Sequence, residues 1–311
     1  MTDKFELNQL RALVSVIETG SFSAAAQQQK QTQSAVSQLI ASLEQALGCQ
    51  LFDRRHRPVK PTLIGRQTYQ HARRILQESQ RLHQSIEAAQ SGRLPQLRMG
   101  LMDSLAAVIG LPLITQLHSQ VNQISLLTGT APELLSALQA GRLDLIMAVV
   151  EQESVSSLVM TPLFTESFFI VTPTAWRTVS LKALSANFPY IAYAGNTPTG
   201  VQTSNWLKWR GMQVESRFTL SRAEQILTLV AQNQGWTLAT PFFLADNPML
   251  FTQLHCQPID KPGLKRQIVL MTREGELEQV IAPLKQSVTR LIQTRVVEPL
   301  TQDWPWMEIE S

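Results

Sequence analysis

The chain has 311 residues, of which 44% are hydrophobic and 16% are charged, which is typical of folded globular protein and not of a disordered chain. The length suits two or three domains. The absence of any run of about eighteen apolar residues argues against a membrane span. The net charge of +3 is uneven: the first 93 residues hold 12 Lys and Arg against 7 Asp and Glu, and the remainder holds 15 against 17. A basic surplus in the front third favours contact with a polyanion there.

The amino-terminal residues and the cysteines indicate a cytoplasmic protein. Residues 1–6 are mixed in charge and lack the apolar stretch of a secretory signal. Only two cysteines occur, Cys49 and Cys256, and their separation does not match a metal site. We therefore expect buried free thiols in a reducing compartment.

The first part of the chain predicts three short helices. Gly20 ends the first helix, Ser21 or Ser23 caps the second, and Thr32 caps a third that ends at Gly48. The apolar residues of the first helix recur three or four positions apart, at Leu7, Leu10, Leu13, Val14 and Ile17. The third helix is expected to bury Val36, Leu39, Ile40, Leu43 and Leu47. Small alanines at 24–26 permit the close helix crossing of a helix-turn-helix.

A predicted wing and a long helix follow. A short strand at 51–52, a basic turn and a returning strand near residue 60 form the wing, and residues 63–90 predict one helix. This helix carries a weakly apolar heptad seam of Thr68, Ala72, Ile75, Ser79, Leu82, Ile86 and Ala89. Either the seam pairs two chains through Ala72, Ile75, Leu82 and Ile86, or the helix packs on its own domain.

Beyond a break at 91–95, strands and helices alternate. Strands are expected at 97–101, 123–127, 143–150, 168–171, 190–193, 236–239 and 267–272. Helices are expected to end near His118, to span 132–140, 223–233 and 276–293, and to include 205–210. The first three strands and their connecting helices predict a parallel sheet with helices on both faces.

Several segments at fixed spacing resemble the DNA-binding domain of LysR-type transcriptional regulators. They are residues 20–26 (GSFSAAA), 34–40 (SAVSQLI), 43–44 (LE), 47–48 (LG) and 51–54 (LFDR). Residues 134–145, with Leu134, Leu138, Gly141 and Asp144, are similar to the signature of the family's sensor domain. The sequence departs from the family pattern at Pro61, where leucine is usual, and at Gln38, where a basic residue is frequent.

The resemblance implies an α plus α/β architecture. A winged helix-turn-helix would occupy residues 1–62, a dimerising linker helix 63–92, an effector domain of the periplasmic-binding-protein type 93–295, and a tail 296–311. Subdomain I of the effector domain would hold about 94–164 and 265–293, and subdomain II about 165–264. The resemblance also implies binding to double-stranded promoter DNA, a small-molecule effector between the subdomains, a homotetramer made of two dimers, and RNA polymerase as a partner if the protein is an activator. No cofactor and no membrane association are expected.

The exposed face of the third helix suits a DNA major groove because its side chains are small or polar. Gln33 and Gln38 can each bond an adenine edge, and Ser34, Ser37 and the helix N-terminus suit phosphate oxygens. The wing arginines suit the DNA backbone or minor groove. The full predicted DNA-binding set is Ser23, Thr32, Gln33, Ser34, Ser37, Gln38, Arg54, Arg55 and Arg57. The alternative is a merely solvated polar face.

Polar residues at strand ends are the candidates for effector binding, since ligands of open parallel sheets lie beyond the carboxyl ends of the strands. The predicted set is Met102, Asp103, Ser104, Thr128, Gly129, Thr130, Thr197, Thr199, Gly200 and Pro241. Ser104, Thr130 and Thr199 can bond a carboxylate, the commonest ligand group in the family. Asp103 either points at the ligand, which would disfavour an acid, or caps the following helix, and we favour the cap.

Other functions lack support in the sequence. The five histidines are spaced for no common metal, and no Gly-rich phosphate loop, G-x-S-x-G elbow or H-E-x-x-H motif occurs, so an enzyme is not expected. A solute-binding protein of a transport system would need export, which the helix-turn-helix argues against. The tail with Trp304 and Trp306 either docks on the sensor domain or is a mobile end, and the sequence leaves both open.

Overall fold

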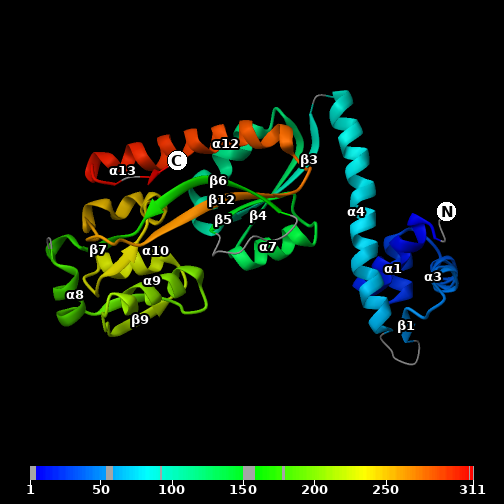
Figure 1. Cartoon of the computed structure of the whole chain (residues 1–311), viewed down its shortest axis with the longest axis horizontal. Helices are drawn as coiled ribbons and strands as arrows, with labels where there is room; N and C mark the ends of the chain where they lie inside the picture. Colours follow the sequence, from blue (N-terminus) through cyan, green and yellow to red (C-terminus); the bar gives the residue numbers. More distant parts are fainter. Residues whose placement is uncertain are drawn as a thin grey trace. The chain divides into compact units, whose positions relative to one another are not determined.

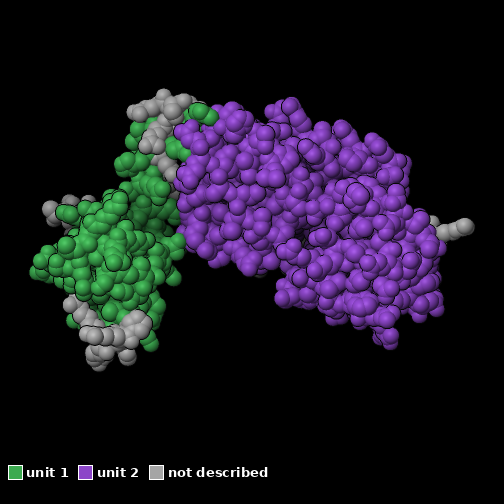
Figure 2. Space-filling view, turned by 180° about the vertical axis from the view of Figure 1, so that it is seen from behind, with its two compact units in different colours: residues 1–95 green, residues 96–311 purple. Residues whose placement is uncertain are grey.

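The computed structural model describes residues 5–53, 59–91, 93–149, 158–176, 179–307 and 309–310. The chain divides into two compact units, residues 1–95 and 96–311, each with its own core (Figure 2). The wing residues Arg54, Arg55 and Arg57 lie outside the described part of the chain.

The amino-terminal unit consists of three helices, a two-stranded wing and one long helix (Figure 1). Its elements are α1 (Leu7–Thr19), α2 (Phe22–Gln28), α3 (Gln33–Leu47), β1 (Phe52–Asp53), β2 (Lys60–Pro61) and α4 (Leu63–Ser91). The predicted caps are confirmed: Ser21 Oγ accepts from Ala24 N at 3.4 Å and Thr32 Oγ1 from Ala35 N at 3.2 Å. Gly48 ends α3 with φ of 68°, a left-handed conformation that glycine adopts without strain.

The core of this unit lies where α1, α2 and α3 cross. Ala25 and Ala26 of α2 are buried there, which confirms that small residues allow the close crossing. Val36, Ile40 and Leu43 of α3 are buried as predicted. The predicted buried face of α3 is too wide, however, because Leu39 is half-buried and Leu47 near the helix end is exposed beside an open hollow.

The second unit is built on a six-stranded sheet in the order β13-β6-β12-β5-β3-β4. Strands β3 and β5 are parallel, as predicted, whereas β12 is antiparallel to β5 and to β6, so the sheet is mixed. Figure 1 shows α12 on one face and α7 on the other. The elements of this first lobe are β3 (Leu94–Met102), α5 (Asp103–Leu105), η1 (Ala106–Gly110), α6 (Leu111–Leu117), β4 (Val121–Gly129), α7 (Ala131–Gln139), β5 (Leu145–Val149), β6 (Leu158–Ser167), β12 (Lys265–Arg273) and α12 (Glu278–Ile292).

A second lobe, formed by residues 168–264, lies between the two long strands β6 and β12. It has an antiparallel sheet in the order β10-β7-β11 and a parallel pair, β8 and β9. Its elements are β7 (Phe169–Pro173), η2 (Thr174–Trp176), α8 (Leu181–Asn187), β8 (Tyr190–Tyr193), α9 (Pro198–Trp209), β9 (Ser216–Leu220), α10 (Ala223–Ala231), β10 (Thr237–Ala239), α11 (Pro241–Ala245), η3 (Pro248–Gln253) and β11 (Leu254–Pro258). The lobes are thus joined by two strands, and every movement of one lobe against the other must bend β6 and β12 or their ends.

The carboxyl-terminal tail docks on the second unit, which answers the question that the sequence left open. It forms η4 (Gln293–Val297), α13 (Glu298–Asp303) and β13 (Ile309–Glu310). Strand β13 pairs antiparallel with β6 and so extends the main sheet at its edge.

Candidate nucleic-acid interface and effector-binding residues

The exposed face of α3 carries the predicted DNA-reading residues. Thr32, Gln33, Ser34 and Gln38 are exposed and Ser37 is half-buried, on the side of α3 opposite the buried Val36 and Ile40. No bulky side chain stands among them, so the helix can approach the floor of a major groove.

Two hydrogen bonds order the start of α3. The hydroxyl of Ser23 on α2 donates to Oε1 of Gln33 at 3.2 Å, and the hydroxyls of Thr32 and Ser34 lie 3.0 Å apart. The Gln33 carbonyl oxygen keeps a second lone pair and its Nε2 keeps its protons, so both atoms can still bond a base edge. The predicted bidentate contact from Gln33 to adenine is therefore compatible with the Ser23 bond.

Lys30 is a basic residue that the sequence analysis did not single out. It lies in the turn between α2 and α3 with φ of 53°, and its side chain is exposed two residues before the cap of α3. A cation beside a helix N-terminus suits a phosphate oxygen. Lys30 follows three glutamines and has no other basic residue nearby in the sequence. It therefore belongs to no basic cluster that could have marked it as a DNA contact.

The first strand of the wing contacts helices α2 and α3. Glu44 of α3 accepts hydrogen bonds from the amides of Leu51 and Phe52 at 2.8 and 3.3 Å. The rings of Phe22 and Phe52 lie 5.6 Å apart. Pro61 pairs opposite Phe52 at the end of β2, so a residue without an amide proton is accommodated at the edge of a two-residue strand.

Along α4, three of the predicted seam residues are available to a partner. Ile75, Leu82 and Ile86 are 40%, 61% and 50% exposed. The prediction for Ala72 is wrong, because this residue is 1% exposed and belongs to the core of its own unit. The heptad pattern correctly placed Ala72 on the apolar side of the helix. In the first part of α4, however, that side packs against α1 of the same chain and is not available to a partner.

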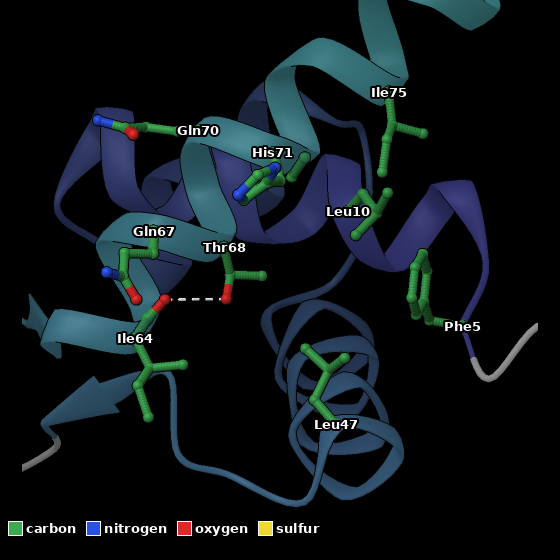
Figure 3. Close-up of a pocket in the computed structure, with 10 residues that line it drawn as sticks. Phe5, Leu10, Leu47, Ile64, Gln67, Thr68, Gln70, His71 and Ile75 are labelled. Carbon is green, nitrogen blue, oxygen red and sulfur yellow. Dashed lines mark hydrogen bonds between the residues drawn. The ribbon is translucent and has the colours of Figure 1, made fainter.

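A hollow of about 610 Å³, lined by both apolar and polar residues, lies between α1, the end of α3 and the first half of α4. Figure 3 shows Phe5, Leu10, Leu47, Ile64 and Ile75 around its opening. Thr68 in its lining donates its hydroxyl proton to Ile64 O at 2.8 Å, and Gln67, Gln70 and His71 add further polar groups (Figure 3). The hollow adjoins Ile75, so exposed apolar surface continues from α4 into it.

The effector residues after β3 and β4 differ in their availability. Helix α5 begins at Asp103 with Met102 as its N-cap, so the favoured role of Asp103 as a cap is wrong and its exposed carboxylate is at the first helical position. Thr130 gives both its amide and its hydroxyl proton to Glu133, at 2.9 and 2.7 Å. These bonds lower the pKa of Glu133, the amide bond contributing most. The T-x-x-E spacing, which is typical of a capping box, could have revealed this pair in the sequence.

In the second lobe, Thr197 is used to begin a helix. Its hydroxyl accepts from Gly200 N at 3.1 Å and donates to Ala194 O at 2.7 Å. Gly200 is required there, since a Cβ would lie 2.1 Å from Ala194 O. Among the residues that the structure describes, the half-buried Ser104 and Thr199 hydroxyls bond to no other group of the chain. The remaining predicted residues are the exposed Thr128, the half-buried Gly129 and the buried Pro241, which opens α11.

A buried ion pair that the sequence analysis missed lies where the lobes join. The Arg266 guanidinium on β12 bonds Glu166 Oε1 on β6 through Nε at 2.6 Å and Thr240 Oγ1 through Nη2 at 3.1 Å. Both charged side chains are at most 2% exposed. The other carboxylate oxygen accepts from Phe242 N at 3.4 Å at the start of α11. The two partners are 100 residues apart in different strands, so no local pattern pointed to them.

Two tyrosines of β8 have buried hydroxyls. Burial raises the pKa of Tyr190 to about 12, partly offset by the nearby Thr203 and Thr237 hydroxyls. Burial also raises the pKa of Tyr193, with a smaller opposing effect of Arg266. Neither hydroxyl has a hydrogen-bond partner within the described ranges. Cys256 is buried, which raises the pKa of its thiol, whereas Cys49 is only half-buried, contrary to expectation.

The described residues hold neither a cluster of metal ligands nor a membrane-spanning helix. No three His, Cys, Asp or Glu side chains gather there as metal ligands. None of the helices described is both long and apolar enough to cross a bilayer.

Comparison with known proteins agrees with this arrangement. Residues 7–66 match the model of the bacterial regulatory helix-turn-helix proteins of the lysR family, and residues 90–291 match the LysR substrate binding domain. The chain is 26% identical over 279 residues to a probable nitrogen assimilation transcriptional activator of Synechococcus elongatus, which covers 87% of this chain and 90% of that protein. It is 32% identical over 171 residues to the nitrogen assimilation regulatory protein of Klebsiella aerogenes, which covers 53% of this chain and about half (55%) of that protein.

Solved structures share the fold. A full-length OxyR variant from Pseudomonas aeruginosa has a TM-score of 0.69 at 20% identity, covering 91% of this chain and 94% of the other. CbnR in complex with its target DNA has a TM-score of 0.63 at 19% identity, covering 92% and 100%. The two family models together span the helix-turn-helix and both lobes, and so the chain belongs to the LysR family of transcriptional regulators.

Proposed function

We propose that α3 reads promoter DNA in the major groove, with Gln33 and Gln38 contacting base edges. The observation that carries this proposal is the exposed face of α3, where small and polar side chains surround a glutamine held by Ser23. A single Nε2 donor from Gln33 suits an acceptor on a base, such as guanine O6 or N7 or thymine O4. Because the Gln33 carbonyl oxygen can accept a second hydrogen bond, Gln33 can also form the bidentate adenine contact.

Phosphate contacts would fix the register of α3 on the DNA without reading sequence. The groups suited to this are the hydroxyls of Ser34 and Ser37, the exposed amines of Lys30 and Lys60, and the wing arginines Arg54, Arg55 and Arg57. Such contacts release counterions, so binding should weaken steeply as salt rises.

The oligomer is expected to form through α4. Ile75, Leu82 and Ile86 place apolar surface on one side of a helix that is otherwise polar, and the hollow beside Ile75 offers further apolar surface. A second copy of the chain buries this surface and presents a second α3 to a dyad-symmetric DNA site. Pairing of the effector domains would then join two dimers in a tetramer.

The effector is expected at the strand ends where Ser104 and Thr199 have free hydroxyls. Asp103 and Glu133 place two carboxylates beside the ends of β3 and β4, and Thr130 already gives its protons to one of them. These charges disfavour a further anion, so an effector with an amino group or no net charge fits better than a carboxylic acid. Because it binds one arrangement of the lobes more tightly, the effector would shift the oligomer between two states.

Regulation would take place in the cytoplasm, with RNA polymerase as a further partner if the protein activates transcription. The direct test is selection of binding sites by the purified full-length protein from a pool of random DNA. We expect enrichment of a dyad-symmetric sequence with two half-sites about one helical turn apart or a multiple of that. A pool that remains random after repeated selection, with folded protein, would contradict the proposal.

A further inference from the structure

The tail that follows α12 crosses from the first lobe to the second. We define it as the strap, residues 293–310, which lie beyond the part of the chain that matches the LysR substrate binding domain. Its segment η4 continues α12 of the first lobe, and both η4 and α13 pack against α11 of the second lobe. Val296 of η4 and Leu300 of α13 are buried.

Two tryptophans fasten the strap to the second lobe. The ring of Trp304 meets Phe251 of η3 edge-on, with centroids 5.2 Å apart, and Trp304 is buried. The ring of Trp306 meets Phe169 of β7 edge-on at 5.7 Å. Edge-to-face contacts depend on ring position, so they are lost when the rings shift.

The end of the strap returns to a strand that joins the lobes. In β13, Ile309 pairs with Glu166 of β6 and Glu310 with Thr165. Lys265, at the start of the other joining strand, forms an ion pair with Glu310. The strand therefore lies against the last residues before the chain enters the second lobe at Phe168, and Glu166 is also the residue whose carboxylate holds Arg266 and the start of α11.

We propose that the strap sets the angle between the two lobes by binding both of them across the strands that join them. A hinge rotation at the ends of β6 and β12 must either separate the tryptophans from Phe169 and Phe251 or slide α11 along η4 and α13. Packed contacts of this kind change in discrete steps and resist continuous deformation. The strap thus favours one arrangement of the lobes, and an effector that binds another arrangement more tightly must also break these contacts.

The test measures the distance between the lobes in the full-length protein by electron spin resonance of paired spin labels. Labels are placed at the exposed positions Gln139→Cys on α7 and Lys208→Cys on α9, with Cys49→Ser to remove the half-buried thiol and an excess of unlabelled chain to suppress distances between copies. The variants are a deletion of residues 304–311 and the milder Trp306→Ala. The matched control is Trp209→Ala, since Trp209 lies on α9 and is 67% exposed.

We expect one narrow distance peak in the wild type and in Trp209→Ala, and a broadened or split peak in both strap variants. If the deletion variant fails to fold, Trp306→Ala alone decides the matter. An unchanged peak in a folded strap variant would overturn the proposal and would leave the DNA-binding function untouched, because neither label nor strap lies in the amino-terminal unit.

Discussion

The hydroxyl of Ser23 donates to Oε1 of Gln33 at 3.2 Å, which joins the second helix of the helix-turn-helix to the first turn of the third. Both residues are exposed, so the bond restrains a side chain that faces solvent in the free protein. A restrained glutamine loses less side-chain entropy when it binds a base, since part of its rotamer freedom is already gone.

Replacing Gln33 with Ala should weaken binding to the cognate site by about 1–3 kcal/mol, which is the worth of a good base contact. Binding to unrelated DNA should hardly change, because it depends on phosphate contacts. Ser23→Ala should give a smaller loss at the cognate site. Fluorescence anisotropy with both DNAs at fixed salt measures these effects.

The matched control for Gln33→Ala is Gln139→Ala, an exposed glutamine of α7 in the other unit. It should bind both DNAs as the wild type does. Equal losses at cognate and unrelated DNA in Gln33→Ala would show that this side chain does not read sequence.

The seam on α4 makes a second prediction. Ile75→Glu combined with Leu82→Glu places charges on the exposed apolar side of the helix, so the dimer should dissociate while each chain stays folded. Sedimentation velocity should show monomers, and Gln80→Glu on the same helix should leave the oligomer intact. A double variant that sediments as the wild type does would refute the seam.

A substitution at Ala72 distinguishes a residue of the core from a residue of the dimer seam. Because it is buried within its own unit, Ala72→Glu should unfold the amino-terminal unit, with a loss of about 3 kcal/mol or more, and should not yield folded monomers. Circular dichroism during thermal unfolding distinguishes the two results. If the Ala72→Glu variant is instead folded and monomeric, Ala72 belongs to the dimer interface and not to the core.

The buried pair of Arg266 and Glu166 should be sensitive to loss of one charge. Glu166→Gln leaves an unpaired guanidinium in the core, at an expected cost of about 3–5 kcal/mol in the free energy of unfolding. The double variant Glu166→Leu with Arg266→Met should lose less than the single one, because no charge is left buried. Urea unfolding measures both.

The exposed pair of Lys265 and Glu310 is the control for the buried one. Its side chains are 52% and 58% exposed, so Glu310→Gln should change the free energy of unfolding by about 0.5 kcal/mol or less. If Glu166→Gln and Glu310→Gln lower the free energy of unfolding by similar amounts, burial is not what makes the Arg266–Glu166 pair sensitive.

Stability should fall as the pH rises from about 10 to about 12. Tyr190 has a folded-state pKa of about 12, above the unfolded value of 10, so the unfolded chain loses this proton first and is favoured as the pH rises through that window. Below pH 10 the contribution is fully present. Tyr190→Phe should flatten this slope in urea unfolding measured at pH 9 to 11, and an unchanged slope would mean that Tyr190 ionises at its ordinary pKa.

Local sequence signals predicted the helix ends well, whereas contacts between residues far apart in the sequence were not predicted. The caps at Ser21 and Thr32 and the stop at Gly48 depend on neighbouring residues, and each was placed correctly. Strands β6, β9 and β11 were not predicted from pattern, because they mix apolar and polar residues without clear alternation. Their positions are set by pairing with distant strands, as for β6 with β12.

The site residues divide in the same way. The exposed face of α3 was predicted correctly, because the apolar and polar sides of a single helix are visible in the sequence; that this face reads DNA stays a prediction. Asp103 was misjudged because the cap position differs from the first helical position by a single residue, which sequence cannot fix. The heptad pattern could not tell whether Ala72 faces its own core or a partner, since both surfaces are apolar.

The most direct test of the account is genome-wide binding of the tagged, full-length protein in its own host, beside the Gln33→Ala variant at equal abundance. We predict a small number of sharp peaks that share one dyad-symmetric sequence and that weaken or disappear in the variant. Diffuse enrichment across the genome, the same for both proteins, would contradict sequence-specific reading by α3.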